Sequence, residues 1–123
     1  EGAWISETLD TSNYTTNATP SITNSGNAET PPVITITAPG GGLTAFSAQN
    51  TTSVKTLSWA GSLTSAQVLI IDMENFSITE AGVASLAGFS GVFWNLNAGS
   101  NSLSLTSTPT GAAVVITKRD RWA

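Results

Sequence analysis

The sequence predicts an all-β fold, an antiparallel β-sandwich of galectin-like or jelly-roll type. Short segments in which apolar and polar residues alternate recur along the chain, separated by clusters of Gly, Pro, Asn and Ser. Runs with the 3.6-residue period of a helix are almost absent. The chain is also rich in Ser, Thr and Asn, which disfavour the interior of a helix. We therefore expect roughly eight or nine short strands in two packed layers.

The strongest strand signals are the alternating residues 33–37, after Pro31-Pro32, and the continuous apolar run 68–73. The second run is typical of a strand that is covered on both faces. Further strands are predicted at residues 21–29, 43–48, 54–59, 76–79, 92–96, 103–105 and 113–117, and residues 83–86 are expected to pair only briefly. Turns or loops rich in Gly, Asn or Ser are predicted between them, at residues 39–42, 50–53, 61–65, 80–82, 88–91, 97–101 and 108–111.

The chain has 123 residues, which suits one ordinary domain. Residues 1–19 are polar and rich in Asn and Thr, and we interpret them as a lead-in, part linker and part edge strand. Residues 20–123 are expected to form a single β-sandwich domain. Hydrophobic residues make up 40% of the chain, which is enough for a core.

The composition excludes several classes of protein. The chain has no His and no Cys, so Ser-His-Asp triads, thiol catalysis, disulfides and the common zinc sites are ruled out. The net charge is −4, which argues against a nucleic-acid partner. No apolar run reaches the roughly 18–20 residues of a membrane helix, so no membrane partner is expected either. Asp72 and Glu74 are interpreted as residues of a turn, and we expect no metal, no cofactor and no enzymatic activity.

One group of residues could bind a carbohydrate. Trp59, Phe93 and Trp94 could form an aromatic platform for a sugar ring, with the amides of Asn95 and Asn97 beside it. The alternative is a structural role, because successive residues of a strand face opposite ways. At least one ring of the adjacent pair Phe93 and Trp94 is then expected in the core.

The C-terminus holds Lys118, Arg119 and Arg121, which are three of the four basic residues in the chain. Three basic residues give too few phosphate contacts for strong binding to nucleic acid. We expect them to pair with Asp120 or with acidic groups on a neighbouring subunit.

A series of motifs runs from about residue 23 to residue 122. The motifs are Asn24-Ser25-Gly26-Asn27, Pro32-Val33-Ile34-Thr35-Ile36, Asn50-Thr51-Thr52, Leu69-Ile70-Ile71-Asp72, Phe93-Trp94-Asn95-Leu96, Gly99-Ser100-Asn101 and Arg119-Asp120-Arg121-Trp122. In this order and spacing they resemble the C-terminal β-sandwich domain of siphophage tail proteins of the distal tail and minor tail type. Two positions depart from the family pattern, Lys118 in place of a tyrosine and Ala98 in place of a proline.

The resemblance implies a non-enzymatic structural domain at the tail tip of a phage or prophage, peripheral to the tail hub. Its expected roles are assembly and host-surface attachment, and its expected location is the virion tail. The implied partners are other tail proteins, further copies of the chain in the virion, and a host cell-surface glycan. The ring-forming N-terminal domain of the distal tail subunit has no match here, so we expect the peripheral domain alone or a related decoration.

The resemblance also implies architectural roles for the matching residues. Asn27 and Asn101 would bond the backbone of turns, Asp72 would end a strand, and Trp94 and Trp122 would close the sandwich. The other matching positions with a structural role are Gly99 and Arg119.

Two alternative functions stay open at this point. The aromatic group above would suit a carbohydrate-binding module. The Ser- and Thr-rich composition without Cys would suit a domain of a bacterial surface adhesin, outside the cell or on its surface.

Overall fold

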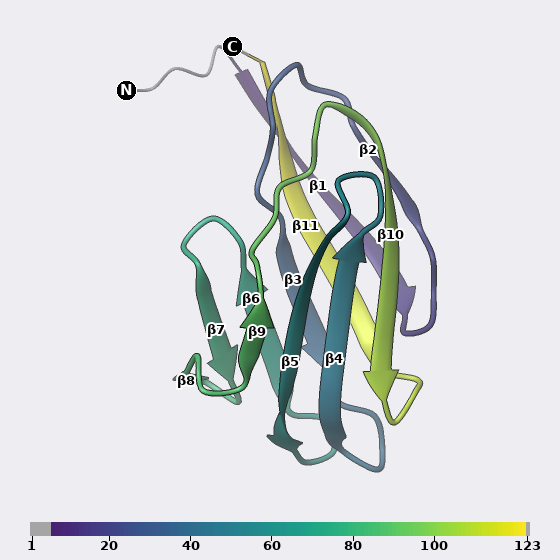
Figure 1. The fold of residues 1–123 in the computed structure, drawn as a ribbon, viewed down its shortest axis with the longest axis vertical. Helices are drawn as coiled ribbons and strands as arrows, with labels where there is room; N and C mark the ends of the chain where they lie inside the picture. The colour runs from purple at the N-terminus through teal and green to yellow at the C-terminus, as the bar shows by residue number, and fades with distance from the viewer. Residues whose placement is uncertain (1–5, 123) are drawn as a thin grey trace.

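The computed structural model describes the backbone of residues 6–122 and the side chains of residues 11–119. Eleven strands form two antiparallel sheets that pack face to face as a sandwich (Figure 1). The predicted fold class, an all-β antiparallel sandwich, is therefore confirmed.

The first sheet has six strands in the order β1-β11-β3-β6-β7-β8. β1 pairs with β11 over its full length, from Ser6 opposite Trp122 to Thr15 opposite Ala113. It is the edge strand that was expected within residues 1–19, while residues 1–5 lie outside the described residues. The domain boundary between residues 19 and 20 stays a prediction. The strands of this sheet are β1 (Ser6–Thr15), β3 (Val33–Thr37), β6 (Val68–Asp72), β7 (Ser77–Glu80), β8 (Val83–Ala84) and β11 (Ala113–Trp122).

The second sheet has five strands in the order β2-β10-β4-β5-β9. The long strand β10 pairs with β2 through Gly99–Ser102 and with β4 through Leu103–Thr108. Because β10 changes partner along its length, it links the short strand β2 to β4 at the centre of the sheet. The strands are β2 (Ser21–Asn24), β4 (Leu43–Asn50), β5 (Lys55–Leu63), β9 (Phe89–Gly91) and β10 (Gly99–Thr108).

Side chains of alternate strand residues fill the space between the sheets. In β3, Ile34 and Ile36 are fully buried and the residues between them are half-buried. β6 shows the same pattern, with Leu69 and Ile71 pointing inward. Val68 and Ile70 in β6 keep some exposure, so the prediction that this strand is covered on both faces is wrong.

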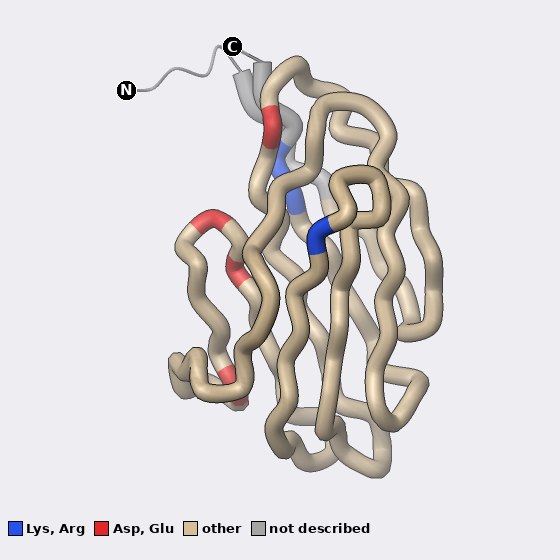
Figure 2. Tube along the Cα trace, viewed as in Figure 1, with Lys and Arg blue, Asp and Glu red and all other residues tan. Residues whose placement is uncertain are grey.

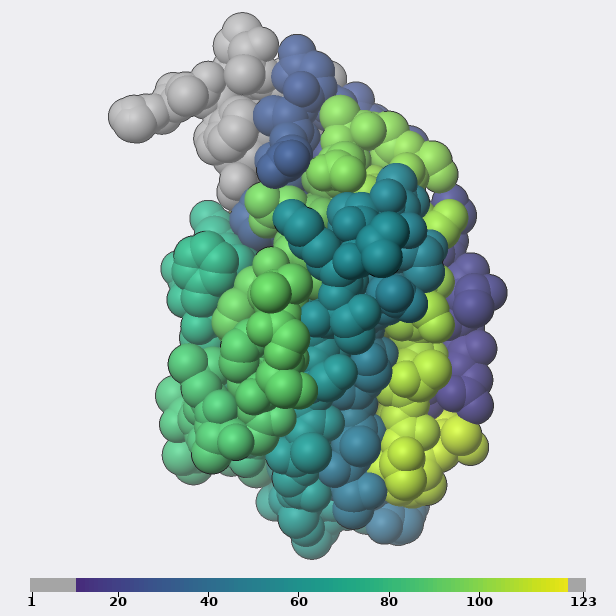
Figure 3. Space-filling model, in the orientation of Figure 1, coloured from purple at the N-terminus to yellow at the C-terminus, as the bar shows by residue number. Residues whose placement is uncertain are grey.

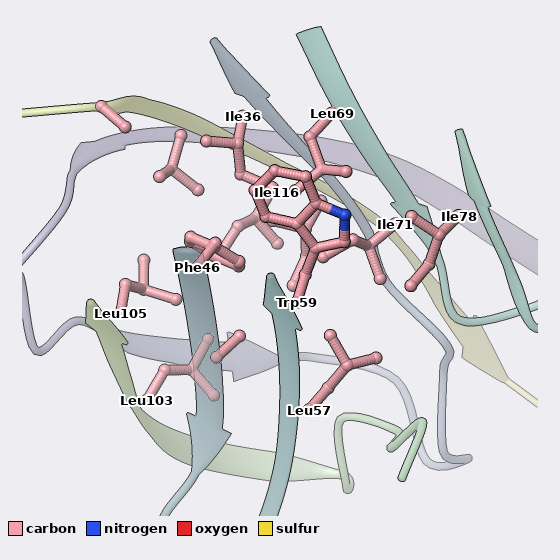
Figure 4. Packing of buried hydrophobic residues seen from close by; sticks show 14 of the residues in the cluster. Ile36, Phe46, Leu57, Trp59, Leu69, Ile71, Ile78, Leu103, Leu105 and Ile116 are labelled. Carbon is pink, nitrogen blue, oxygen red and sulfur yellow. The ribbon is translucent and has the colours of Figure 1, made fainter. Parts of the chain in front are cut away.

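The core draws side chains from both sheets, and Figure 4 shows the Trp59 ring of the second sheet lying against Ile36 and Leu69 of the first. Burial of each Leu or Ile side chain contributes roughly 1.5–3 kcal/mol to folding. The largest fully buried side chains are Trp59, Phe46, Ile34, Ile36, Leu43, Leu57, Leu69, Ile71, Met73, Ile78, Leu96 and Leu103.

The predicted strand at residues 92–96 is wrong, and the predicted loop at 88–91 contains β9. Residues 92–96 lie between β9 and β10, both of the second sheet, and make separate contacts instead of a ladder. The Val92 N–H donates to the Thr56 carbonyl at 3.0 Å, and Leu96 exchanges backbone hydrogen bonds with Thr30. Trp94 and Leu96 are nonetheless buried. The alternation of apolar and polar residues therefore predicts correctly which side chains are buried, but it does not predict whether the segment pairs with a strand.

Other strand limits also differ from the prediction. β5 continues through the predicted turn at 61–65 as far as Leu63, which pairs with Leu43 and is buried. The strand has a glycine at position 61, where a Cβ atom would lie only 2.6 Å from Cζ2 of Trp59. Likewise β10 begins at Gly99 inside the predicted connection 97–101, and β11 runs on to Trp122.

Three buried asparagines hold the loops at the upper end of the sandwich in Figure 1: Asn24, Asn50 and Asn101. Asn101 Oδ1 accepts the backbone N–H of Asn97 at 2.9 Å, and its Nδ2 donates to the Asn97 and Gly99 carbonyls at 2.8 and 3.1 Å. Asn50 Nδ2 lies 3.4 Å from the same Oδ1 and 3.2 Å from the Asn95 carbonyl. These amides satisfy backbone groups that no strand pairs.

Asn24 does the same for the β2–β3 loop. Its Nδ2 donates to the carbonyls of Ala28 and Leu96, at 2.8 and 3.3 Å, and its Oδ1 accepts the Gly26 N–H at 3.1 Å. The bond to Leu96 joins this loop to the segment that precedes β10. The loops at this end are therefore tied to one another as well as to their own strands.

The other residues with expected architectural roles lie as follows. Asp72 ends β6, and its carboxylate accepts hydrogen bonds from the Glu74 and Asn75 backbone and from Asn75 Nδ2. Gly99 begins β10 with φ +93°. Asn27 and Arg119 are exposed, the latter on β11. The side chain of Trp122 lies outside the described residues, and its predicted role stays a prediction.

Trp94→Ala is expected to lower the free energy of unfolding by about 3–5 kcal/mol, because it empties a buried site. It also removes the indole that donates to the Ala48 carbonyl at 3.0 Å. Urea denaturation of the purified domain measures the change. Val92→Ala is the control, since Val92 lies in the same segment but is 48% exposed. A folded Trp94→Ala variant with nearly unchanged stability would contradict the core assignment.

Asn101→Ala is expected to lower the free energy of unfolding by about 2–3 kcal/mol, because buried backbone groups of the 97–99 loop lose their partner. Differential scanning calorimetry should show a lower melting temperature. Ser102→Ala, an exposed change one residue away, should leave that temperature nearly unchanged. Equal effects of the two changes would mean that the amide does not hold the loop.

Candidate functional site

No group of acidic residues that could hold a metal ion occurs among the described residues. The described carboxylates are few, and Figure 2 shows most of them on the β6–β7 hairpin. In the described part of the chain, no helix has the length and apolar character needed to cross a membrane.

Trp59, one of the predicted sugar-binding residues, belongs to the core. Its side chain is 1% exposed, and its Nε1 donates to Oε2 of Glu80 at 2.9 Å. Because Glu80 is in β7 of the other sheet, this hydrogen bond joins the two layers. The buried ring offers no face to a sugar in this structure.

Trp94 is also buried, with 2% of its surface exposed. Phe93, the residue before it, is half-buried and points toward the β7–β9 side of the sandwich, where it packs against Phe76 and Phe89. The two neighbours thus face opposite ways, as the alternation argument predicts.

A small hollow brings together the other predicted sugar-binding residues. Phe93, Asn95 and Asn97 line a hollow of about 120 Å³ with an edge of Trp94. Asn95 Nδ2 donates to Oε1 of Glu29 at 3.2 Å at its rim. The remaining lining residues are Ser53, Lys55 and Phe76.

A row of three aromatic rings runs from the core to the surface beside this hollow. Phe89 and Phe93 are stacked with centroids 4.8 Å apart, and Phe93 meets Phe76 edge to face at 5.6 Å. Phe89 and Phe93 pack on the core, whereas Phe76 is 65% exposed. The sequence predicts that Phe76 begins a strand, but β7 begins one residue later, at Ser77. Phe76 is instead the last residue of the preceding turn and has φ +53°.

An apolar surface extends from Phe76 along the edge of the first sheet, and sequence reasoning missed it. Val83 and Leu86 are 67% and 52% exposed. A hollow of about 320 Å³ lies between Phe76 and Leu86, and its other lining residues are Ser77, Ile78, Ala84 and Ser85. We call Phe76, Val83, Ala84 and Leu86 the Phe76–Leu86 surface. Brief pairing is predicted for residues 83–86, and Val83–Ala84 pair as β8, but the outward apolar side chains carried no separate signal.

The outer face of the second sheet has a different character. Lys55 is the only charged residue in its five strands, as Figure 2 shows. A hollow of about 280 Å³ lies over β4, β5 and β10 on the face seen in Figure 3. Its lining includes the small residues Ala45, Ser47, Ser58, Ala60, Ser90 and Thr106. This face can meet a partner through hydroxyl groups and backbone, without charge.

Comparison with known proteins finds solved structures of similar fold. The crystal structure of the Dit protein of phage SPP1, described as a paradigm of the hub adsorption apparatus in phages that infect Gram-positive bacteria, matches with a TM-score of 0.71 and 17% sequence identity. The match covers 91% of this chain and 47% of that chain, so the present chain spans about half the length of the SPP1 protein. No curated protein sequence matches.

The family comparison covers most of the sandwich. Residues 25–122 match the model of the siphovirus-type tail component, C-terminal domain. This range contains nine of the eleven strands, β3 to β11, and begins directly after β2. The chain therefore belongs to the Dit-type siphovirus tail component family, and it is a non-enzymatic structural component of a phage tail.

Proposed function

We propose that this domain lies on the outside of the tail hub and acts in assembly, by contact with neighbouring tail proteins. The observation that carries the proposal is the family match over residues 25–122, which spans nearly the whole sandwich. Two further features support it. The described residues include no group that could hold a metal ion, and they form two faces suited to contact, the nearly uncharged second sheet and the Phe76–Leu86 surface.

The proposed partners are other tail proteins, together with further copies of this chain around the tail. A tail is symmetric, so each contact of one domain is repeated by every copy. Repeated weak contacts give strong overall attachment through avidity. A modest surface on a small domain is then sufficient for a stable assembly.

Antibody labelling of intact phage tails tests this location. Fab fragments raised against the purified domain should label the distal end of the tail, outside the hub, at several positions around the axis in negative-stain electron microscopy. Fab fragments saturated beforehand with the purified domain are the control. Label along the tail tube, or no label at the distal end, would contradict the proposed location.

A second candidate function is attachment to a host cell-surface glycan. The hollow of Phe93, Asn95 and Asn97 favours it, because an aromatic ring and two amides converge there beside Glu29. Aromatic rings supply apolar contact, and amide groups can pair with sugar hydroxyls. Trp94 lines the same hollow although it is almost wholly buried, and Trp59 is not among the lining residues.

Binding to isolated cell-wall glycans from a panel of bacteria tests this second function. Asn95→Ala should weaken saturable binding to the recognised glycan about tenfold, the effect of losing roughly one hydrogen bond. Thr106→Ala on the outer face of β10 is the control and should leave binding unchanged. A folded domain that binds none of the glycans would exclude this function and leave the assembly role.

A further inference from the structure

We infer that the Phe76–Leu86 surface is a docking site for a cationic segment of a neighbouring tail protein. An aliphatic or aromatic side chain of that segment would enter the hollow between Phe76 and Leu86, and its Lys or Arg residues would face the carboxylates around the hollow. This inference rests on the proposed assembly function, because it takes the partner to be a tail protein.

The first support is the exposure of large apolar side chains along one edge of the first sheet. Phe76, Val83 and Leu86 are each more than half exposed, and the hollow between Phe76 and Leu86 measures about 320 Å³. Contiguous apolar surface with a polar rim marks interaction sites on soluble proteins. Large aromatic and aliphatic anchors in pockets contribute most of the binding energy in such interfaces.

The second support is that the exposed ring is held in place. Phe76 is the outer end of the row of rings that begins at Phe89 on the core. Its backbone has φ +53°, a conformation that costs roughly 1–2 kcal/mol for a residue with a Cβ atom. The Asp72 carboxylate fixes the turn that precedes it by accepting the Glu74 and Asn75 N–H groups. A pre-positioned ring loses little entropy when a partner binds.

The third support is the charge around the hollow, which identifies the partner's chemistry. Asp72 pairs with Ser77 beside Phe76, whereas the carboxylate of Glu80, at the other end of β7, accepts the indole N–H of Trp59 between the sheets. Glu74 lies in the turn between β6 and β7. The sequence has no Lys or Arg from residue 56 to residue 117, and Figure 2 shows only acidic positions on this hairpin. A positively charged segment is therefore attracted, and an anionic lipid or phosphate is repelled.

The sheet edge leaves room for this partner. β8 is the outermost strand of the six-stranded sheet in the described part of the chain, and it contains only two residues. The hollow opens beside this short strand, and residues 85–88 lead away from it into β9. An incoming segment thus meets side chains, not a long strand edge, so recognition depends on apolar fit and charge.

Photo-crosslinking in assembled tails tests the inference. Benzoylphenylalanine is placed at Leu86, or at Val83, in the phage-encoded chain, and intact tails are irradiated and analysed by mass spectrometry. Both positions should crosslink to another tail protein, at a segment in which Lys or Arg flanks an apolar residue. Thr23, exposed on β2, is the control position and should not give that adduct.

Two variants, read out with the crosslinker at Val83, separate charge from apolar contact. Leu86→Asp should reduce the adduct about tenfold or more, because it places a charge in the apolar contact. Val54→Asp is its matched control, since Val54 is also an exposed apolar residue but lies in the β4–β5 turn. Glu74→Lys should reduce the adduct about two- to fivefold, and Thr23→Lys should not. Unchanged melting temperatures establish that each variant is folded.

The outcomes separate this inference from the proposed function. Tails that carry the domain at the distal end but give no adduct at Leu86 or Val83 would overturn the docking site and leave the assembly role in place. An adduct with a second copy of this chain, or with an acidic segment, would overturn the partner assigned here. Tails that lack the domain altogether would overturn the proposed function, and the docking site with it.

Discussion

The position of Trp59 between the two sheets sets much of the structure around it. Its ring is buried against Ile36 and Leu69 of the opposite sheet, and its indole N–H reaches Glu80 in β7. Two positions beside the ring have room only for glycine. A Cβ atom would lie 2.6 Å from the ring at Gly61 and 3.3 Å from it at Gly88. The close approach of β5, β7 and the start of β9 therefore follows from one large side chain that must be both buried and hydrogen-bonded.

Polar side chains hold the turns of the molecule in two different ways. At one end Asn24, Asn50 and Asn101 are buried, and their amides satisfy loop backbone that no strand pairs. A side-chain amide both donates and accepts, so one residue can hold a loop on both sides. On the β6–β7 hairpin, the carboxylate of Asp72 stabilises a surface turn by accepting hydrogen bonds from the Glu74 backbone and the Asn75 side chain. A buried amide network stiffens the loops, whereas the exposed carboxylate leaves its charge available to a partner.

Much of the fold could be predicted from the sequence, because alternation reports which side chains face the core. Ile34, Ile36, Leu69 and Ile71 are inward as the pattern requires. The pattern does not report pairing, and so the segment around Trp94 was placed in a strand although its backbone bonds to Thr30 and Thr56. The surface was harder to foresee. Trp59 and an exposed Phe76 look alike in a sequence, and only the contacts across the two sheets decide which ring is buried.

The low charge of the chain has a physical consequence for a tail component. Only 10% of its residues are charged, against roughly 25% in an average soluble domain, and the five strands of the second sheet hold a single Lys. Such a surface has little long-range repulsion, so copies and neighbours can approach closely within an assembly. The same surface would give a free protein little protection against association. Charge is therefore nearly absent from the second sheet, which needs only to fit, whereas the β6–β7 hairpin beside Phe76 carries acidic residues that can select a partner.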